Sequence, residues 1–335
     1  MCPPNLFYHT GELSQDAFLA WLLRWAHPAT NQHDNNMHAV GVSFLQRLLQ
    51  TYGQTYDGTS SVEVRRQYKN IDLLVVTEKH VLLIEDKVHS KDHSGQLARY
   101  RGTIQNEAEL NGKTLCPIFL KTGSQATYKN IEEAGYKLFL RNNMLSFLQE
   151  KTNHNIILKE FYNHLRRMEE NEQSFSTTSP DKWDYDAWIG FYQTLQNDEN
   201  HFPDLDWDYV NNRSGGFAGC WWGAQEWRGA EVYLQLQQNK LCFKISIEEV
   251  TFEQAGARDL RKNWKNLILQ QAKEKRLPIK APTKMGYGRT MTCGIVERSD
   301  WMATTTQNLI DIKETINKLS SYTTLCRAAA NNNPP

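Results

Sequence analysis

The sequence predicts an α/β protein with a mixed β-sheet core flanked by helices, followed by a C-terminal α+β domain that contains an antiparallel meander. Apolar residues recur at helical spacing near the start, strand-like segments follow between residues 61 and 140, and a second group of strands lies between 217 and 247. The length of 335 residues exceeds what one hydrophobic core usually organises, so we expect two domains.

In the first domain, expected over residues 1–170, helices should precede strands. Ser14 can cap a helix whose apolar residues, from Phe18 to Leu23, recur at helical spacing. Four successive apolar residues at 81–84 indicate a central strand that is covered on both faces. The other expected elements are a helix at 39–49, strands at 61–66, 72–76, 81–88, 116–121 and 136–140, and helices at 95–110, near Leu145 and near Phe161.

The second domain, expected over residues 181–327, follows a polar, Ser/Thr-rich segment that ends in Pro180. Apolar and polar residues alternate along 241–247, which is typical of a strand with one buried face. From Ala328 onward we expect disorder. The expected elements are strands at 217–223, 231–237 and 241–247, a helix at 257–275, a strand at 290–296 and a helix at 305–319.

The composition, 40% hydrophobic and 23% charged, is that of an ordinary soluble globular protein. The longest apolar run, residues 17–23, is far shorter than the roughly 20 residues that span a bilayer, and no signal sequence opens the chain, so we expect a cytoplasmic protein without a membrane role. The six cysteines form no Cys-x-x-Cys pair, which argues against zinc and redox motifs. Because the formal net charge is zero, any nucleic-acid contact must come from local patches or a bound metal ion.

Asp72, Glu85 and Lys87 are the residues best suited to hydrolyse a phosphodiester bond. Side chains alternate along a strand, so Glu85 and Lys87 should share a face, with Asp86 on the other, and Asp72 lies on the hairpin partner. Two carboxylates can hold divalent cations, and an amine can orient or activate the attacking water. The competing interpretation of Glu85 and Lys87 is a solvated salt bridge at a strand end.

Ile71-Asp72, a hairpin and then Ile84-Glu85-Asp86-Lys87 resemble the signature of the PD-(D/E)XK nuclease superfamily, with isoleucine in place of the family's proline. Gln96-Leu97-Ala98-Arg99-Tyr100 resembles the Gln-x-x-x-Tyr element that follows the catalytic strand in RecB-like members. The resemblance covers about residues 10–150 and implies a restriction-endonuclease-like fold for the first domain.

The resemblance also implies a metal site. By position, Asp72 and Glu85 would ligate Mg²⁺ or Mn²⁺, and Asp86 would add its main-chain carbonyl. Members of the superfamily often add an acidic residue from the first helix, for which Glu12 is the natural candidate and Asp16 the fallback. The alternative for Glu12 is a favourable charge at the positive end of that helix.

The resemblance gives Lys87 the role of positioning or activating water, while Gln96 and Tyr100 would contact DNA or the water network. Lys121 ends the strand at 116–121 and could approach a phosphate, although a surface lysine at a strand terminus is an equally good interpretation.

Basic residues gather on the helix expected at 257–275, and this stripe is the best candidate for phosphate contacts outside the first domain. The ordinary alternative is a solvated helix face. Trp221, Trp222 and Trp227 could stack unpaired bases, but core positions are more typical of tryptophans on a meander. The basic candidates are Arg258, Arg261, Lys262 and Lys265.

Together these observations predict a divalent-metal-dependent nuclease that hydrolyses phosphodiester bonds, with DNA as the preferred substrate and phage defence or DNA repair as the expected role. Nucleic acid would be its main partner, and the C-terminal domain could bind a partner protein or a second copy. Two alternatives stay open: a catalytically inactive nuclease-like binding module, against which the intact Asp/Glu/Lys set argues, and an RNase.

Overall fold

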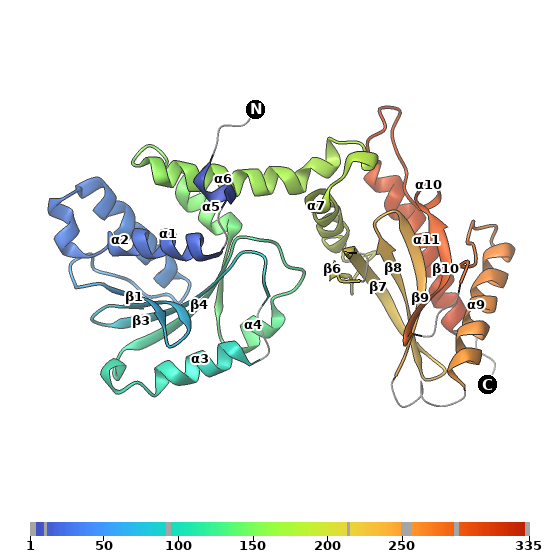
Figure 1. Cartoon of the computed structure of the whole chain (residues 1–335), viewed down its shortest axis with the longest axis horizontal. Helices are drawn as coiled ribbons and strands as arrows, with labels where there is room; N and C mark the ends of the chain where they lie inside the picture. The colour runs from blue at the N-terminus through green and yellow to red at the C-terminus, as the bar shows by residue number, and fades with distance from the viewer. Residues whose placement is uncertain are drawn as a thin grey trace. The chain divides into compact units, whose positions relative to one another are not determined.

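The computed structural model describes residues 5–9, 12–91, 95–212, 215–248, 256–284 and 288–331, and of residues 8, 9, 12 and 13 it describes the backbone alone. The chain divides into two compact units, Met1–Glu169 and Glu170–Pro335 (Figure 1). Each unit contains a sheet of five strands. Within the described residues, every helix is too short or too polar to cross a bilayer.

The sheet of the first unit is mixed and has the order β1-β2-β3-β4-β5. Its first three strands are antiparallel, and the last two continue the sheet in the parallel sense. This is the mixed core that the sequence predicted. The strands are β1 (Glu63–Tyr68), β2 (Ile71–Val76), β3 (His80–Lys87), β4 (Thr114–Lys121) and β5 (Lys137–Leu140).

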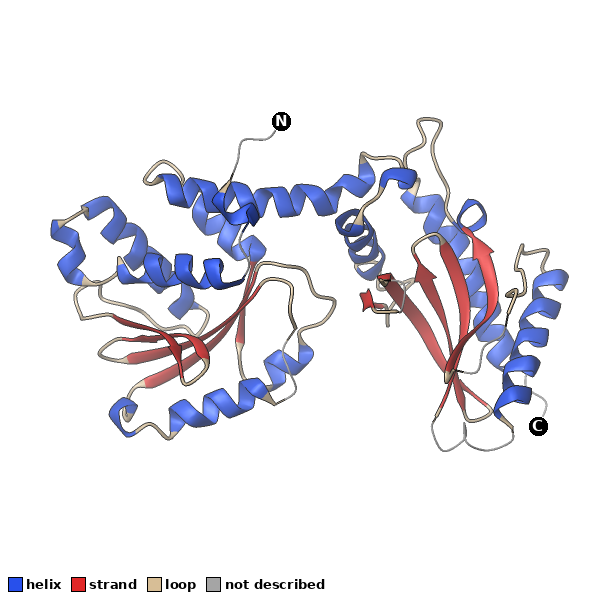
Figure 2. Ribbon diagram, in the orientation of Figure 1, coloured by secondary structure: helices blue, strands red, loops and turns tan. Residues whose placement is uncertain are grey.

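Helices cover both faces of this sheet (Figure 2). One face packs against α1 (Glu12–Arg24), α2 (Asn35–Gln50), α5 (Arg141–Gln149) and α6 (Ile156–Gln173), and the other against α3 (Gln96–Gln105) and α4 (Lys129–Glu133). Short 3₁₀ helices complete the unit: η1 (Leu6–His9), η2 (Pro28–Gln32) and η3 (Ala108–Leu110).

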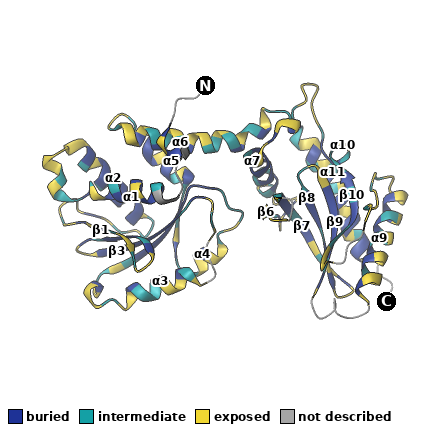
Figure 3. Cartoon of the chain, viewed as in Figure 1, coloured by how far each residue is buried: buried dark blue, intermediate teal, exposed yellow. Residues whose placement is uncertain are grey.

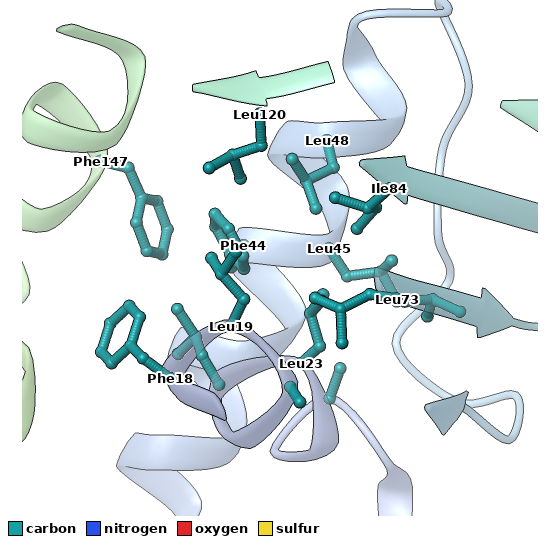
Figure 4. Close-up of a cluster of buried hydrophobic side chains, with 14 of the residues drawn as sticks. Phe18, Leu19, Leu23, Phe44, Leu45, Leu48, Leu73, Ile84, Leu120 and Phe147 are labelled. Atoms are coloured by element: carbon teal, nitrogen blue, oxygen red, sulfur yellow. The ribbon is translucent and has the colours of Figure 1, made fainter. Parts of the chain in front are cut away.

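Alternation along the central strands divides the apolar residues between two cores. Leu73, Ile84 and Leu120 point toward α1 and α2, where Leu19 and Phe44 complete the cluster (Figure 4). The core on the α3 side contains their neighbours along the strands, Leu74, Leu83 and Phe119. Every residue of β3 except Lys87 is buried, as expected for a central strand covered on both faces.

The sheet of the second unit is antiparallel and has the order β10-β9-β8-β7-β6. Figure 3 shows buried residues along its strands and on the sides of the helices that pack against them. The strands are β6 (Asp206–Val210), β7 (Phe217–Trp227), β8 (Ala230–Gln237), β9 (Lys240–Ile247) and β10 (Thr290–Glu297). The helices are η4 (Ser174–Ser176), η5 (Pro180–Lys182), α7 (Tyr185–Gln196), α9 (Ala257–Glu274), α10 (Arg298–Trp301) and α11 (Ile312–Asn331).

The C-terminal helix corrects the expectation of disorder for residues 328–331, whereas residues 332–335 lie outside the described residues. α11 continues to Asn331, and Ala329 and Ala330 are buried. They extend the stripe of Tyr322 and Cys326 at helical spacing, and alanine has the highest helix propensity of all residues. The same helix starts later than the predicted 305, because Thr304 and Ile310 pair across an isolated bridge.

Two elements between residues 181 and 210, a segment rich in Asp and Glu, were not predicted. Asp184 caps α7 by accepting a hydrogen bond from the Ala187 amide at 3.0 Å. Trp188, Phe191 and Leu195 are buried on that helix, and β6 follows it. The surrounding carboxylates obscured an apolar stripe with helical spacing.

Candidate active site

Two neighbouring strands bring Asp72, Glu85 and Lys87 to one end of the first sheet. Leu73 pairs with Ile84 in the antiparallel register, so Asp72, the residue before Leu73, lies beside the end of β3. Glu85 and Lys87 lie on the same face of β3 as Leu83, which is the face toward α3. Asp86 lies on the other face, together with Ile84. The strands therefore place charged residues where their apolar segments end.

The ammonium group of Lys87 lies between the two carboxylates. Its Nζ atom is 2.7 Å from Glu85 Oε1 and 3.8 Å from Asp72 Oδ2. The Glu85 side chain is 1% exposed, against 12% for Lys87 and 17% for Asp72. A solvated surface salt bridge, the competing interpretation of this pair, does not describe a carboxylate so deeply buried.

Gln96 and Tyr100 complete this side of the site. They are four residues apart, in the first two turns of α3, and so share a helix face. The Gln96 amide donates hydrogen bonds to Glu85 Oε1 at 2.9 Å and to the Tyr100 hydroxyl at 3.0 Å. The structure thus brings Gln96 to the glutamate and Tyr100 to Gln96, and Gln96 helps to fix the orientation of the Glu85 carboxylate.

On the opposite face of β3, Gln15 joins α1 to the ends of two strands. Its amide donates to Asp86 Oδ1 at 2.6 Å, and its carbonyl accepts from the Thr122 hydroxyl at 2.7 Å. The Thr122 amide donates to the main-chain carbonyl of Lys87 at 3.2 Å. Sequence reasoning missed Gln15, and its only signal was a glutamine within an otherwise apolar helix face.

Gln67 links Asp72 to the first helix. Its amide donates to Asp16 Oδ2 at 3.2 Å and to Asp72 Oδ1 at 3.4 Å, while Asp72 Oδ2 accepts from the Asp86 main-chain amide at 2.9 Å. Both oxygens of Asp72 are therefore oriented by the protein. Gln67 has a φ of 50°, and this left-handed conformation near the end of β1 was not foreseeable from the sequence.

The acidic residues on the α1 side are held close together. Burial raises the pKa of Asp86 well above its usual value, and Asp16 and Asp72 raise it further. Burial also raises the pKa of Asp16, with Asp72 as the next cause. The two aspartates therefore take up a proton more readily than free aspartic acid.

Lys121 lies on β4 beside Lys87, in parallel register with it. Its side chain is 1% exposed, and Nζ donates to the Ser90 carbonyl at 2.6 Å. Neither a surface lysine nor an accessible phosphate ligand fits this burial. The backbone of Glu12 begins α1, but its side chain lies outside the described residues.

The basic candidates on α9 do not form one stripe. Arg258 and Lys262 are exposed and Lys265 is half-buried, but Arg261 is buried and donates to the Gly288 carbonyl at 2.9 Å. The buried face of α9 includes Ala257 and Trp264, and Arg261 falls on it by helical spacing.

The predicted tryptophans also differ in burial. Trp222 and Trp227 are core residues, whereas Trp221 is half-buried. The core interpretation therefore holds for Trp222 and Trp227, and of the three tryptophans Trp221 alone is accessible enough to stack on a ligand.

The donor set fits a divalent cation in part. Within the described residues no group of three or more His, Cys, Asp or Glu that could hold a metal ion is found. The carboxylates of Asp72 and Glu85 nevertheless both face one positive charge, the Lys87 ammonium, and carboxylate oxygens are the ligands that Mg²⁺ prefers. Because Mg²⁺ keeps several waters, two protein carboxylates are enough to anchor it.

Comparison with known proteins agrees with this arrangement. A family model described as the PD-(D/E)XK nuclease superfamily matches residues 5–175, just over half of the chain. Searches of curated proteins and of solved structures gave no significant match. The matched residues contain the complete first sheet, the helices on both of its faces and the Asp72/Glu85/Lys87 cluster. The chain therefore belongs to the PD-(D/E)XK nuclease superfamily.

Proposed function

We propose that the protein is a divalent-metal-dependent nuclease that cleaves phosphodiester bonds in DNA, with its active site at Asp72, Glu85 and Lys87. The observation that carries the proposal is the convergence of two oriented carboxylates around one ammonium group at the end of a buried strand. Buried charge is unfavourable for folding, so its concentration here points to function rather than stability.

Asp72 and Glu85 would hold the cation, with the main-chain carbonyl of Asp86 as a further ligand and Glu12 as a candidate from the first helix. A bound Mg²⁺ or Mn²⁺ would polarise the scissile phosphate and lower the pKa of a bound water. The network on the α1 side supports this role, because Gln67 and the Asp86 amide fix both oxygens of Asp72.

Lys87 would position the attacking water. Its ammonium group donates to Glu85 at 2.7 Å, and a lysine side chain has enough rotatable bonds to redirect that hydrogen bond to water or a phosphate oxygen. Gln96, held by the Tyr100 hydroxyl, would keep Glu85 in place during that change. This is the role we assign to the Gln-x-x-x-Tyr element, by analogy with RecB-like nucleases.

The biological setting is proposed by analogy. Nucleases of this superfamily serve phage defence and DNA repair, and we favour one of these roles. A two-fold dimer would allow both strands of a duplex to be cut. The cytoplasmic location stays a prediction from the sequence, and so do phosphate contacts by Arg258, Lys262 and Lys265 on α9.

The first test is cleavage of plasmid and of labelled oligonucleotides with Mg²⁺, with Mn²⁺ and with a chelator. We expect metal-dependent cleavage, and a loss of at least about 100-fold in Asp72→Asn and in Lys87→Met. Glu78→Gln and Lys79→Met are matched controls, because both residues are exposed in the β2–β3 turn, at the far end of the same strands. They should cleave like the unmodified chain.

Side-by-side DNA and RNA substrates separate the alternatives. Preferential cleavage of RNA would make the protein an RNase with the same site. Absence of cleavage, together with absence of Mg²⁺ and Mn²⁺ binding by calorimetry, would favour a nuclease-like binding module. Cleavage that survives unchanged in both active-site variants would refute the assignment of Asp72 and Lys87.

A further inference from the structure

The second unit contains a groove of about 800 Å³. None of the residues of the Asp72/Glu85/Lys87 site lines it, and of the residues considered as nucleic-acid contacts only Trp221 and Trp222 do. This volume lies within the range of specific ligand pockets. Six residues carry its chemistry: Asp206, Trp221, Glu231, Tyr233, Gln235 and Lys244.

Strand register places these side chains on one face of the sheet. Asp206 pairs with Trp221, and Trp221 pairs with Gln235, so the three form a row across β6, β7 and β8. Tyr233 and Lys244 form the next row, because Tyr233 is two residues from Gln235 and pairs with Lys244 on β9.

The other face of the same sheet is apolar and carries helices. Leu234, Leu236 and Phe243 are buried there, and the ring of Tyr322 on α11 lies 6.5 Å from that of Phe243. The indole of Trp222 donates to the Thr323 hydroxyl of the same helix at 2.9 Å. The groove face is therefore not the face on which this unit builds its core.

Gln235 indicates that the groove is a site rather than a solvated surface. Its side chain is 6% exposed and lines the groove, and no hydrogen-bond partner for its amide is found among the described residues. The rest of the residue is packed, and its amide lines the groove, so it is placed to bond a ligand that both donates and accepts. Trp221 lies in the same row, is half-buried and also lines the groove.

A bulge in β7 fixes one end of the groove. The register shifts between Trp222 and Gln225, and Gly223 has a φ of 68°. At this bulge the Gly223 and Ala224 amides donate to Asp204 Oδ2 at 2.9 and 3.3 Å. The carboxylate of Asp204 is thereby held at the groove, which it also lines.

The groove has a negative charge, which favours a positively charged ligand. Asp204, Asp206 and Glu231 line it, against one base, Lys244. Lys244 is 8% exposed and donates to the Thr292 hydroxyl at 3.3 Å, so little of its charge reaches the groove surface. This excess of carboxylates repels phosphates and attracts cations.

We propose that this groove binds a lysine- or arginine-bearing peptide segment of a partner protein. The basic side chain would stack on Trp221 and pair with Glu231 or Asp206, and the Gln235 amide would bond the peptide backbone. The proposal does not rest on nuclease activity, because the groove shares no residue with the Asp72/Glu85/Lys87 site.

The test is fluorescence anisotropy with the full-length chain and a labelled peptide of alternating arginine and serine, which when extended presents every arginine on one face. We expect saturable binding that weakens as salt rises. Trp221→Ala should weaken binding by about tenfold or more, and Glu231→Gln and Asp206→Asn by several-fold each with a shallower salt dependence.

Two variants serve as matched controls. Tyr209→Ala removes an exposed aromatic side chain from β6. Tyr209 pairs with the buried Ala218, so it lies on the face of the sheet opposite to the groove. Glu274→Gln neutralises an exposed carboxylate on α9. Both should bind like the unmodified chain, and thermal unfolding should show all variants folded.

The proposal would be overturned by no binding of the arginine peptide, by equal binding of the same peptide with glutamate in place of arginine, or by binding that Trp221→Ala and Glu231→Gln leave unchanged. Binding of a labelled oligonucleotide, measured with a chelator present, tests whether the groove binds nucleic acid instead of a peptide. Tighter binding of that oligonucleotide, sensitive to Trp221→Ala, would assign the groove to nucleic acid instead.

Discussion

At the scale of single residues, the charged side chains of the site are held by hydrogen bonds and ion pairs within the protein. Asp72 accepts hydrogen bonds on both oxygens, Glu85 is oriented by Gln96 and Lys87, and Asp86 is held by Gln15. Such constraint limits the rotamers of each charged group, and catalytic groups act best when their geometry is fixed before the substrate binds.

Among the residues around the site, Gln15 is the one whose replacement we expect to reduce the stability of the protein most. It is 3% exposed, and its amide donates a hydrogen bond to the buried carboxylate of Asp86. Gln15→Leu should lower the free energy of unfolding by about 2 kcal/mol, because a buried carboxylate loses a charge-assisted hydrogen bond. Chemical denaturation measures this change.

Gln15→Glu separates hydrogen bonding from packing. Glutamate has nearly the same size but replaces the donor with a carboxylate facing Asp86, so it should destabilise the protein at least as much as leucine does. Gln50→Leu, at an exposed position at the end of α2, should have little effect. A stable Gln15→Glu variant would mean that Gln15 only fills space.

At the scale of elements, the β2–β3 hairpin connects the site to a buried histidine at its far end. His80 begins β3, where its main-chain amide donates to Thr77 Oγ1 at 2.9 Å and its Nε2 lies 3.3 Å from Gln54 Oε1. Burial lowers the pKa of His80 below the usual 6.5, with Lys79 as the second cause.

This lowered pKa predicts the sign of a pH effect. Below the usual histidine pKa the unfolded chain binds a proton that folded His80 resists, so His80 should contribute a loss of stability as the pH drops from about 7.5 to about 5.5. His80→Gln should flatten this dependence when unfolding midpoints are compared across the range. His33→Gln, at an exposed position, should retain the full slope, and an unchanged slope in His80→Gln would contradict the prediction.

At the scale of the whole molecule, the chain has two units, each with its own sheet and its own buried residues. The family match ends at residue 175, close to the end of α6 at Gln173. We interpret this coincidence as two domains, with hydrolysis in the first and recognition in the second.

A fragment ending at Gln173 tests this division. It should unfold cooperatively and keep metal-dependent cleavage that Lys87→Met abolishes, because the first sheet and the helices of both its cores are complete within it. It should lack the binding of basic peptides. A folded fragment without cleavage would show that the second unit supplies part of the nuclease site.

The sequence by itself determined the five strands of the first unit and the convergence of Asp72, Glu85 and Lys87, because strand periodicity and a hairpin are local and fix which side chains share a face. It did not predict α4, and α3 ends at Gln105 and not at the expected 110. It also indicated the Gln96 and Tyr100 pair, four residues apart on one helix. Such relations need no knowledge of distant contacts.

Tertiary structure alone decided the rest. Gln15 meets Asp86 across 71 residues, Lys121 is buried beneath the Ser90 carbonyl, and Arg261 falls on the packed face of its helix. The groove around Trp221 and Gln235 depends likewise on which face of the second sheet the helices cover. Burial and long-range partners are properties of packing, and no local pattern encodes them uniquely.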